Sequence, residues 1–243
     1  MSPLREVEIS ALPMDRLPAV IGEYRLPSWQ AVAAAAREAF AGRTVWNVNS
    51  TAVGGGVAEM LQVLLAYANG AGIDTRWLVI EGDPGFFAVT KRLHNRLHGI
   101  AGDGGRLGVA ERAVLERRWA ANAAELAGVV RPGDVVILHD PQTAGLVAAL
   151  GARGATVVWR CHIGADAVNG HVEEAWEFSR GWLEAADAFV FSRRPHVHAW
   201  MPEQKVAILP PSIDPLSPKN QPLDAAVVRA TLGRIGCLER GEG

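Results

Sequence analysis

The chain runs Val45-Trp46-Asn47-Val48-Asn49-Ser50-Thr51-Ala52-Val53-Gly54-Gly55-Gly56-Val57-Ala58-Glu59-Met60-Leu61 in its first third. This stretch is an apolar strand pattern that breaks at three consecutive glycines and continues as an amphipathic helix. Because glycine has no side chain, backbone N–H groups of such a loop can approach a phosphate or a sugar closely, and the helix dipole favours negative charge there. The stretch therefore predicts a strand, a ligand-binding loop and a helix in succession.

The composition is that of one large globular domain, or of one domain with an appendage. The 243 residues are 49% hydrophobic and 21% charged, with a formal net charge of −2 and an isoelectric point near 6.4. Without a basic surplus, we expect no binding of nucleic acid or of acidic membranes. Two cysteines make no disulfide framework, and the sequence contains neither a secretory signal nor a membrane-spanning run, so we expect a cytoplasmic protein.

Apolar runs of strand length alternate with helical patterns along the chain. The expected strands are 44–49, 75–81, 134–139, 155–162, 188–192 and 205–210, and the expected helices are 29–40, 57–68, 86–97, 115–126, 142–150 and 172–185. Two helices each place four residues on one face: Val57, Leu61, Leu64 and Ala68 in one, and Leu115, Trp119, Asn122 and Leu126 in the other.

Most of the expected strands lack a period of two, which is typical of a parallel sheet covered by helices on both faces. The sequence therefore predicts the α/β class, with a doubly wound, mostly parallel sheet. In such sheets ligands bind beyond the carboxyl ends of the strands, so the residues that follow each strand are the candidates for a site.

The three glycines complete neither of two common nucleotide motifs. The dinucleotide fingerprint needs a further glycine where this chain has Glu59, and no Gly-Lys-Ser/Thr follows for a triphosphate loop. The simpler alternative is a tight turn that needs positive φ. Three glycines in a row cost more backbone entropy than one turn requires, which favours a loop that faces a ligand.

Polar side chains follow two other strands. His139-Asp140-Pro141-Gln142 places an imidazole and an acid at a strand end, although Asp140 could instead only cap the next helix. In Trp159-Arg160-Cys161-His162, a period of two sends Arg160 and His162 to one face, where they could meet one anionic or hydroxylated ligand. Cys161 then points to the other face, and we interpret it as a core residue rather than a nucleophile.

Other polar groups have simpler interpretations. The pairs His94/His98 and His196/His198 lack an obvious third ligand, so we predict no metal site. The segment 81–87 is typical of a turn and a helix start, although its carboxylates could also face a sugar.

A set of motifs occurs in order between Gly42 and Asn220. They are Asn47-Val48-Asn49-Ser50-Thr51 with Gly54-Gly55-Gly56-Val57-Ala58-Glu59, Trp77-Leu78-Val79-Ile80-Glu81-Gly82-Asp83 with Phe86-Phe87 and Thr90-Lys91, His139-Asp140-Pro141-Gln142, Trp159-Arg160-Cys161-His162-Ile163, and Pro210-Pro211-Ser212-Ile213-Asp214-Pro215-Leu216-Ser217 with Lys219-Asn220. Together they resemble the N-terminal half of trehalose synthases of the glycosyl-transferring kind, which are retaining family 4 glycosyltransferases.

The resemblance implies a GT-B architecture of two Rossmann-like domains, the first for the acceptor and the second for the nucleotide sugar. The reaction would transfer glucose from a nucleoside diphosphate glucose to glucose, giving trehalose, with no cofactor because the nucleotide sugar is a substrate. Asp140 and His162 would be catalytic, and Gly54, Gly55 and Gly56 would approach the donor phosphates and the acceptor. The acceptor sugar would contact Asn49, Glu59, His139, Gln142 and Arg160.

The resemblance also implies a division of the chain. Residues 1–43 would form an extension with a helix, 44–214 the acceptor-side domain, and 215–243 a truncated interdomain tail, so that this GT-B half lacks the second domain. A second polypeptide could then supply the donor site, or an exposed apolar face could lead to a homodimer. Members of the family have an aspartate after Trp-Arg-Cys-His-Ile, where this chain has Gly164 and only later Asp166.

Two alternatives stay open. The chain could be a non-catalytic sugar-binding remnant or regulatory module. It could also be a relative of trehalose phosphorylases, which use glucose 1-phosphate, because the three glycines alone do not choose between a phosphate and a diphosphate.

Overall fold

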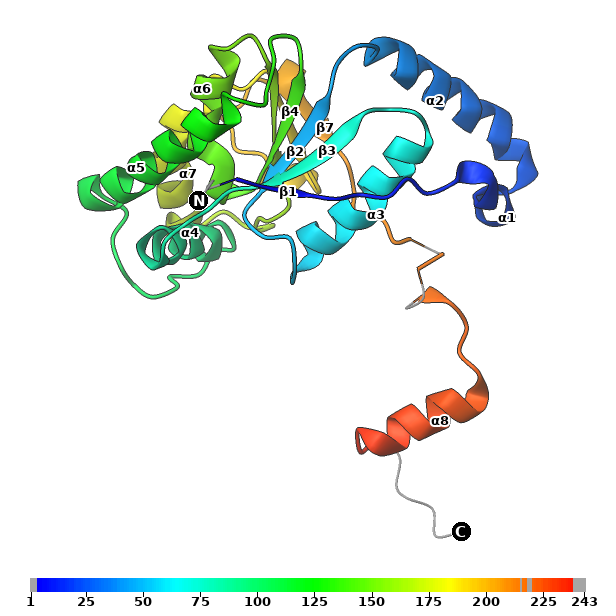
Figure 1. Ribbon diagram of the computed structural model, residues 1–243. Coiled ribbons are helices and arrows are strands. Elements are labelled where there is room, and N and C mark those ends of the chain that lie inside the picture. Colours follow the sequence, from blue (N-terminus) through cyan, green and yellow to red (C-terminus); the bar gives the residue numbers. More distant parts are fainter. Residues whose placement is uncertain (1–3, 215, 218–219, 238–243) are drawn as a thin grey trace. The chain divides into compact units, whose positions relative to one another are not determined.

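The computed structural model describes residues 4–214, 216–217 and 220–237, and divides the chain into two compact units, 1–211 and 212–243. The first unit is built on a seven-stranded sheet of order β1-β3-β2-β4-β5-β6-β7 (Figure 1). The strands are β1 (Arg5–Val7), β2 (Val45–Asn49), β3 (Thr75–Val79), β4 (Val135–His139), β5 (Thr156–Cys161), β6 (Ala188–Phe191) and β7 (Val206–Ile208). All neighbours pair in parallel except β1 and β3.

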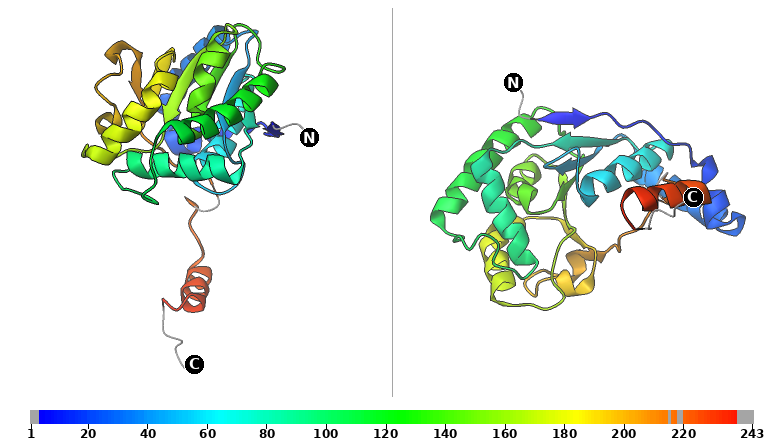
Figure 2. Two further views of the ribbon diagram at one scale, coloured as in Figure 1. Left: turned by 90° about the vertical axis from the view of Figure 1, so that its left-hand side faces the viewer. Right: turned by 90° about the horizontal axis from the view of Figure 1, so that it is seen from below.

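Helices lie on both faces of this sheet, which confirms the predicted doubly wound α/β class. The α-helices of the first unit are α1 (Pro18–Ile21), α2 (Leu26–Ala39), α3 (Gly56–Gly70), α4 (Pro84–Leu97), α5 (Val109–Leu126), α6 (Val147–Gly151) and α7 (Gly170–Leu183). Short 3-10 helices are η1 (Met14–Arg16), η2 (Glu23–Arg25), η3 (Pro141–Leu146), η4 (Arg194–His196) and η5 (Glu203–Lys205). Figure 2 shows α4, α5 and α7 on one side of the sheet and α3 on the other.

The two faces of the sheet are covered to different extents. The α4–α7 side holds the larger core, in which Val136, Leu138, Val157, Trp159 and Phe189 are almost fully buried. On the other face, α3 packs against β3 through a small cluster with Trp77 and Val79. Beyond β2 this face is only partly covered, and Ile137, Val158 and Val190 remain half-buried. The helices therefore cover this face of the sheet less completely than the α4–α7 face.

The predicted buried faces of two helices have different outcomes. In α5, Leu115, Trp119, Asn122 and Leu126 are all buried, as the spacing predicted. In α3, the buried residues are Ala58, Leu61, Leu65 and Ala66, whereas Leu64 is 46% exposed. The assignment of Leu64 to the core face was wrong because α3 turns the side with Ala58 and Leu65 toward β3, so that Leu64 points away from the sheet.

Several boundaries also differ from the sequence expectations. Strand β1 was missed, because three residues at an edge, two of them charged, carry no apolar pattern. The helix expected over 142–150 is a 3-10 helix, η3, that continues as the five-residue α6. The other expected strands and helices are present with shifts of a few residues at their ends. No helix within the described part of the chain is long and apolar enough to cross a membrane.

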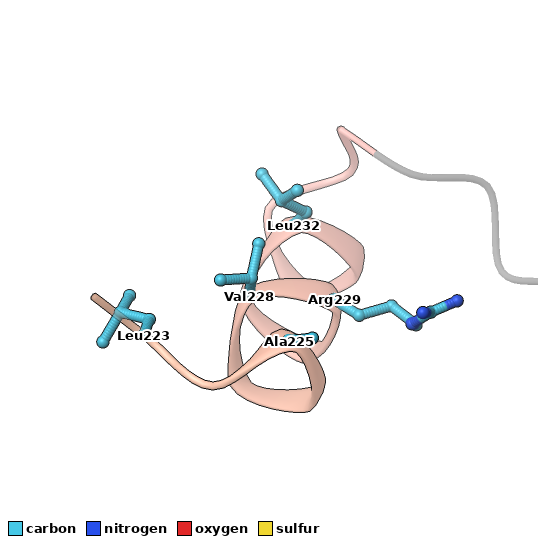
Figure 3. A pocket seen from close by; sticks show the side chains of 5 residues that line it. All are labelled: Leu223, Ala225, Val228, Arg229 and Leu232. Atoms are coloured by element: carbon cyan, nitrogen blue, oxygen red, sulfur yellow. The ribbon is translucent and has the colours of Figure 1, made fainter.

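The second unit is described by itself. Its helix α8 (Ala225–Arg234) is capped at its N-terminus by Asp224, whose carboxylate accepts a hydrogen bond from Ala226 N at 2.7 Å. An open hollow at α8 is lined by Leu223, Ala225, Val228, Arg229 and Leu232. Figure 3 shows the guanidinium of Arg229 extending away from Leu223, Val228 and Leu232. Of the tail expected over 215–243, residues 215, 218, 219 and 238–243 lie outside the described residues.

The buried carboxylate of Asp134 joins the starts of β2 and β4. It accepts hydrogen bonds from Thr44 N at 3.0 Å, Trp46 Nε1 at 3.0 Å and Arg131 N at 2.9 Å, and the residue is only 3% exposed. Burial by itself would raise the pKa of Asp134, but these hydrogen bonds outweigh it and the pKa is lowered. The carboxylate is therefore ionised and fully used in fixing the register of two central strands.

We expect Asp134→Ala to lower the free energy of unfolding by about 3 kcal/mol, because it leaves two backbone N–H groups and an indole N–H without their acceptor. Urea unfolding followed by far-UV circular dichroism measures the change. Glu184→Ala is the control, since the Glu184 side chain is 53% exposed and its i,i+4 pair with Arg180 is a surface pair of little net value. Equal losses in the two variants would contradict this role of Asp134.

Candidate functional site

The carboxyl ends of β2, β4 and β5 bring the predicted polar residues to one edge of the sheet. The three strands are neighbours, and the register opposes His139 to Arg160 and Asn47 to Ile137. Two residues further along, Asn49 therefore falls in the same cross-strand row as His139 and Arg160. The chain leaves β2 toward β3 and leaves β4 toward β5, on opposite sides, so the row crosses the switch point where α/β sheets bind ligands.

A chain of hydrogen bonds crosses this switch point. His139 Nε2 lies 3.1 Å from Asn47 Oδ1, and His139 Nδ1 lies 2.9 Å from His162 Nε2. Asn47 and His139 are 3% and 1% exposed, and Asn47 Nδ2 is buried without a partner among the described residues. Asn47 was missed by the sequence analysis, although an amide inside an apolar strand is a signal that could have identified it.

Both imidazoles of this chain are held neutral. Burial, followed by the positive charge of Arg160, lowers the pKa of His162 to about 4. Burial also lowers the pKa of His139 well below its ordinary value, helped by His162 and Arg160. Neither ring carries a charge near neutral pH, so each can donate one hydrogen bond and accept one.

Asp140 has a strained backbone. Its φ of 62° and ψ of 177° belong to a region that is essentially reserved for glycine, and it is the one non-glycine residue with positive φ among the described residues. Its carbonyl oxygen accepts hydrogen bonds from Trp159 Nε1 at 3.2 Å and from Thr143 Oγ1 at 3.0 Å. Strain of this kind costs about 1–3 kcal/mol and persists only where the surroundings enforce it, which makes Asp140 a strong candidate for function.

The strained backbone aims the Asp140 carboxylate at β5 rather than at the following helix. Oδ1 accepts a hydrogen bond from His162 N at 2.8 Å, and the side chain does not cap η3. The alternative in which Asp140 is only a helix cap is therefore wrong. Burial raises the pKa of Asp140 to about 7, although the hydrogen bond from His162 and the charge of Arg160 oppose the rise.

Arg160 lies half-buried beside this carboxyl. Burial lowers its pKa, whereas the nearby Asp140 raises it. Among the described residues its guanidinium makes no direct hydrogen bond or ion pair, so its donors are open to a ligand. Cys161, on the opposite face, is fully buried and its pKa is raised well above the ordinary value by burial, so it is a core residue as predicted.

The glycine loop follows β2 at the same edge. Gly54 and Gly55 have φ of 77° and 85°, and a Cβ added at Gly54, Gly55 or Gly56 would meet no atom within 4 Å. The loop thus needs glycine for its conformation and leaves open space beside it. Asn49 shapes the loop, since its Nδ2 donates to Thr51 O at 2.7 Å and its Oδ1 accepts from Trp77 Nε1 at 2.8 Å.

Three further residues that the sequence suggested for the site lie on α3, in η3 and at the start of α4. Glu59 is exposed on the first turn of α3, and Gln142 is half-buried in η3, where its carbonyl oxygen accepts a hydrogen bond from Trp119 Nε1 at 2.7 Å. Among the described residues, no hydrogen bond joins the Gln142 side chain to Asp140 or His162. Asp83 caps α4 by accepting a hydrogen bond from Phe86 N at 2.9 Å, so its carboxylate serves a helix start.

The predicted histidine pairs are also placed by the structure. The rings of His94 and His98 lie 4.8 Å apart, and His198 contacts Glu173 at 2.9 Å. Within the described ranges, no group of three or more His, Cys, Asp and Glu side chains converges as a metal site would require.

Gly164, which stands where members of the resembled family have an aspartate, lies tightly against His196. A Cβ added to Gly164 would lie 2.3 Å from His196 Cγ, so the imidazole occupies the space that a side chain at 164 would need. Asp166 instead pairs with Arg193 at 2.6 Å and with His196 Nε2 at 3.4 Å. The Asp166 carboxylate, 54% exposed, therefore takes part in surface pairs with Arg193 and His196.

Comparisons with known proteins agree with this architecture. The UDP-forming alpha,alpha-trehalose-phosphate synthase of Burkholderia xenovorans, solved in complex with glucose-6-phosphate, superposes with a TM-score of 0.51 at 19% identity, over 63% of this chain and 41% of that one. At this identity the likeness concerns the fold alone. The fold is that of one Rossmann-like half of a GT-B glycosyltransferase.

Sequence comparison is more specific. The family model described as "Trehalose synthase, N-terminal domain" matches residues 47–198. Trehalose synthase of Pyrococcus horikoshii is 34% identical over 97% of this chain and 54% of the relative, and trehalose phosphorylase of Pleurotus pulmonarius is 31% identical over 72% of this chain and 26% of the relative. The chain belongs to the family of trehalose synthase N-terminal domains, and it spans about half the length of the P. horikoshii relative.

The raised pKa of Asp140 predicts a pH-dependent stability. Because the pKa is about 7 in the folded state and 3.8 ordinarily, the folded state binds a proton that the unfolded state releases. This contribution to stability is complete below the ordinary pKa of 3.8 and is lost as the pH rises from there through about 7.

We expect the wild type to lose about 2 kcal/mol relative to Asp140→Asn between about pH 5 and about pH 8, less than the full value of the shift because solvent reaches the carboxyl. Asparagine is the matched variant, since it stays neutral and tolerates positive φ about as well as aspartate. Urea unfolding at each pH measures the difference. Parallel stability curves for the two proteins would show that Asp140 titrates normally.

Proposed function

We propose that this chain is the acceptor-binding half of a retaining glucosyltransferase of the trehalose synthase type. The whole enzyme would convert nucleoside diphosphate glucose and glucose into trehalose and nucleoside diphosphate in the cytoplasm. The family match supports this assignment. The observation that carries it is the strained Asp140, whose carboxylate is held beside His162 and Arg160 at the switch point of the sheet.

The chemistry of this edge suits a sugar with several hydroxyl groups. Asp140 Oδ1 is used by His162 N, whereas Oδ2 and His162 Nδ1 have no partner in the part of the chain that the structure describes. Both atoms are hydrogen-bond acceptors when Asp140 is ionised and His162 is neutral, and Arg160 adds donors. Two acceptors and a cation on one rim can hold and orient the acceptor glucose.

In the proposed reaction, the bond between glucose C1 and the diphosphate oxygen breaks while a bond forms from C1 to the acceptor hydroxyl oxygen on the same face. The hydroxyl proton passes to the departing phosphate oxygen, so no enzyme nucleophile is needed. The open glycine loop and the N-terminus of α3 offer backbone N–H groups to the developing phosphate charge. Rate acceleration would come mainly from holding both sugars in place.

Because the donor must be held opposite this rim, we propose that a second half, outside these 243 residues, binds the nucleotide sugar. It would be supplied by a second polypeptide or by a further segment of a longer chain. Neither half alone would turn over substrate, because proximity of donor and acceptor requires both.

Glucose binding to the chain tests the proposed acceptor site. We expect weak binding by titration calorimetry, and an affinity loss of at least about tenfold, or about 1.4 kcal/mol, in Asp140→Ala. Asp187→Asn is a matched control, because Asp187 accepts a hydrogen bond from Val157 N at 2.7 Å at the opposite end of β5. Equal binding by wild type and Asp140→Ala would remove Asp140 from the site.

Turnover distinguishes the proposed function from its alternatives. We expect trehalose from nucleoside diphosphate glucose and glucose when the chain is mixed with the part of the P. horikoshii relative that it does not cover, and none from the chain alone. The phosphorylase relationship at 31% identity favours a second candidate, for which trehalose would be broken down only when inorganic phosphate is present. Binding without turnover in any mixture would indicate a sugar-binding remnant.

A further inference from the structure

The hydrogen-bonded chain from Asn47 through His139 to His162 does more than fill the core. We propose that Asn47 and His139 are positioning residues that hold His162 in a single tautomer, with an outward lone pair on Nδ1 that accepts a hydrogen bond from a sugar hydroxyl group. The nature of that ligand rests on the proposed function, whereas the tautomer follows from the geometry of the three side chains.

The two imidazoles meet at their edges. Their planes are 16° apart, and the ring centroids are separated by 5.2 Å while His139 Nδ1 and His162 Nε2 are 2.9 Å apart. Since the nitrogen atoms are much closer than the centroids and the planes nearly agree, the contact lies along the ring edges, where N–H bonds and lone pairs point. A hydrogen bond between the rings therefore has good alignment.

The direction of each hydrogen bond is then determined from Asn47. Its Oδ1 is an acceptor, so the proton of His139 is on Nε2 and donates to it across 3.1 Å. His139 Nδ1 is left with a lone pair and accepts the proton of His162 Nε2 across 2.9 Å. A neutral His162 with its proton on Nε2 has a lone pair on Nδ1.

Two further observations support this assignment. The lowered pKa of both histidines keeps the rings neutral, so neither imidazole carries a proton on both of its nitrogens near neutral pH. His162 Nδ1 has no partner among the described residues and is not one of their buried unpartnered atoms, so the lone pair is open to solvent. It shares this rim with Asp140, whose carboxylate is bonded to the backbone N–H of His162 itself.

Long-range 1H–15N NMR of the histidine-labelled chain reads the tautomer directly, without ligand. At about pH 8, we expect His162 Nδ1 at the shift of a nitrogen that bears a lone pair and Nε2 at the shift of a protonated one. Comparison with His162→Gln assigns the signals. Protonated Nδ1 in the wild type, which would follow from Asn47 Nδ2 donating to His139, overturns the proposal.

Variants of Asn47 distinguish the effect of its acceptor oxygen from the effect of its side-chain size. Asn47→Leu removes the acceptor, and we expect the His162 signals to move toward a mixture of tautomers. Asn47→Asp keeps an acceptor of the same size and should keep the wild-type tautomer, since a carboxylate can fix an imidazole proton in this way. Asn49→Leu is the matched control on the same strand face, because Asn49 bonds to Trp77 and Thr51 rather than to the histidines.

An unchanged His162 tautomer in Asn47→Leu also overturns the proposal. Should that variant fail to fold, the wild-type and Asn47→Asp spectra decide whether the proposal holds. Glucose takes no part in these measurements. A chain with the expected tautomer that binds no glucose therefore contradicts the proposed function alone, whereas a glucose-binding chain with protonated His162 Nδ1 contradicts the inference alone.

Discussion

The parallel register of β2, β4 and β5 is the constraint on which the site depends. Because adjacent parallel strands end at the same edge, the register places Asn49, His139 and Arg160 in one row and lets Asn47 reach His139 across the switch point. The buried carboxylate of Asp134 fixes the start of this register at the opposite edge, where it joins Thr44 and Trp46 to β4. A slip of one residue would send the row to the other face.

The edge at the carboxyl ends of β2, β4 and β5 combines backbone strain with buried polar groups. Both are unfavourable, and the packed core offsets their cost. Asp140 has a backbone conformation that disfavours any side chain, and the neutral imidazole of His139 and the amide of Asn47 are buried nearby. Trp159 and Thr143 hold the strained carbonyl from β5 and η3, and both are themselves buried in the larger core. The incomplete cover of the sheet beyond β2 leaves Arg160 half-buried rather than sealed, so its charge stays usable.

Most of the fold follows from local patterns in the sequence, and the exceptions have physical reasons. The apolar strands and the buried face of α5 were predictable because their burial repeats along the chain. Strand β1 was not, since an edge strand of three residues is stabilised by pairing with β3 rather than by its own side chains. Leu64 was misplaced because the rotation of α3 is set by packing against Trp77 and Val79, which lie far from it in the sequence.

For the site, the sequence by itself determined which residue types follow β2, β4 and β5, and the resemblance carried by these motifs gave the family. Only the tertiary structure decided that Asp140 bonds to His162 N instead of capping η3, and that Asn47 completes the chain with His139. It also decided that His196 fills the space beside Gly164 and pairs with Asp166. The physical reason is that hydrogen bonds, strain and steric exclusion here join residues from separate strands and loops, and sequence spacing carries no information about such contacts.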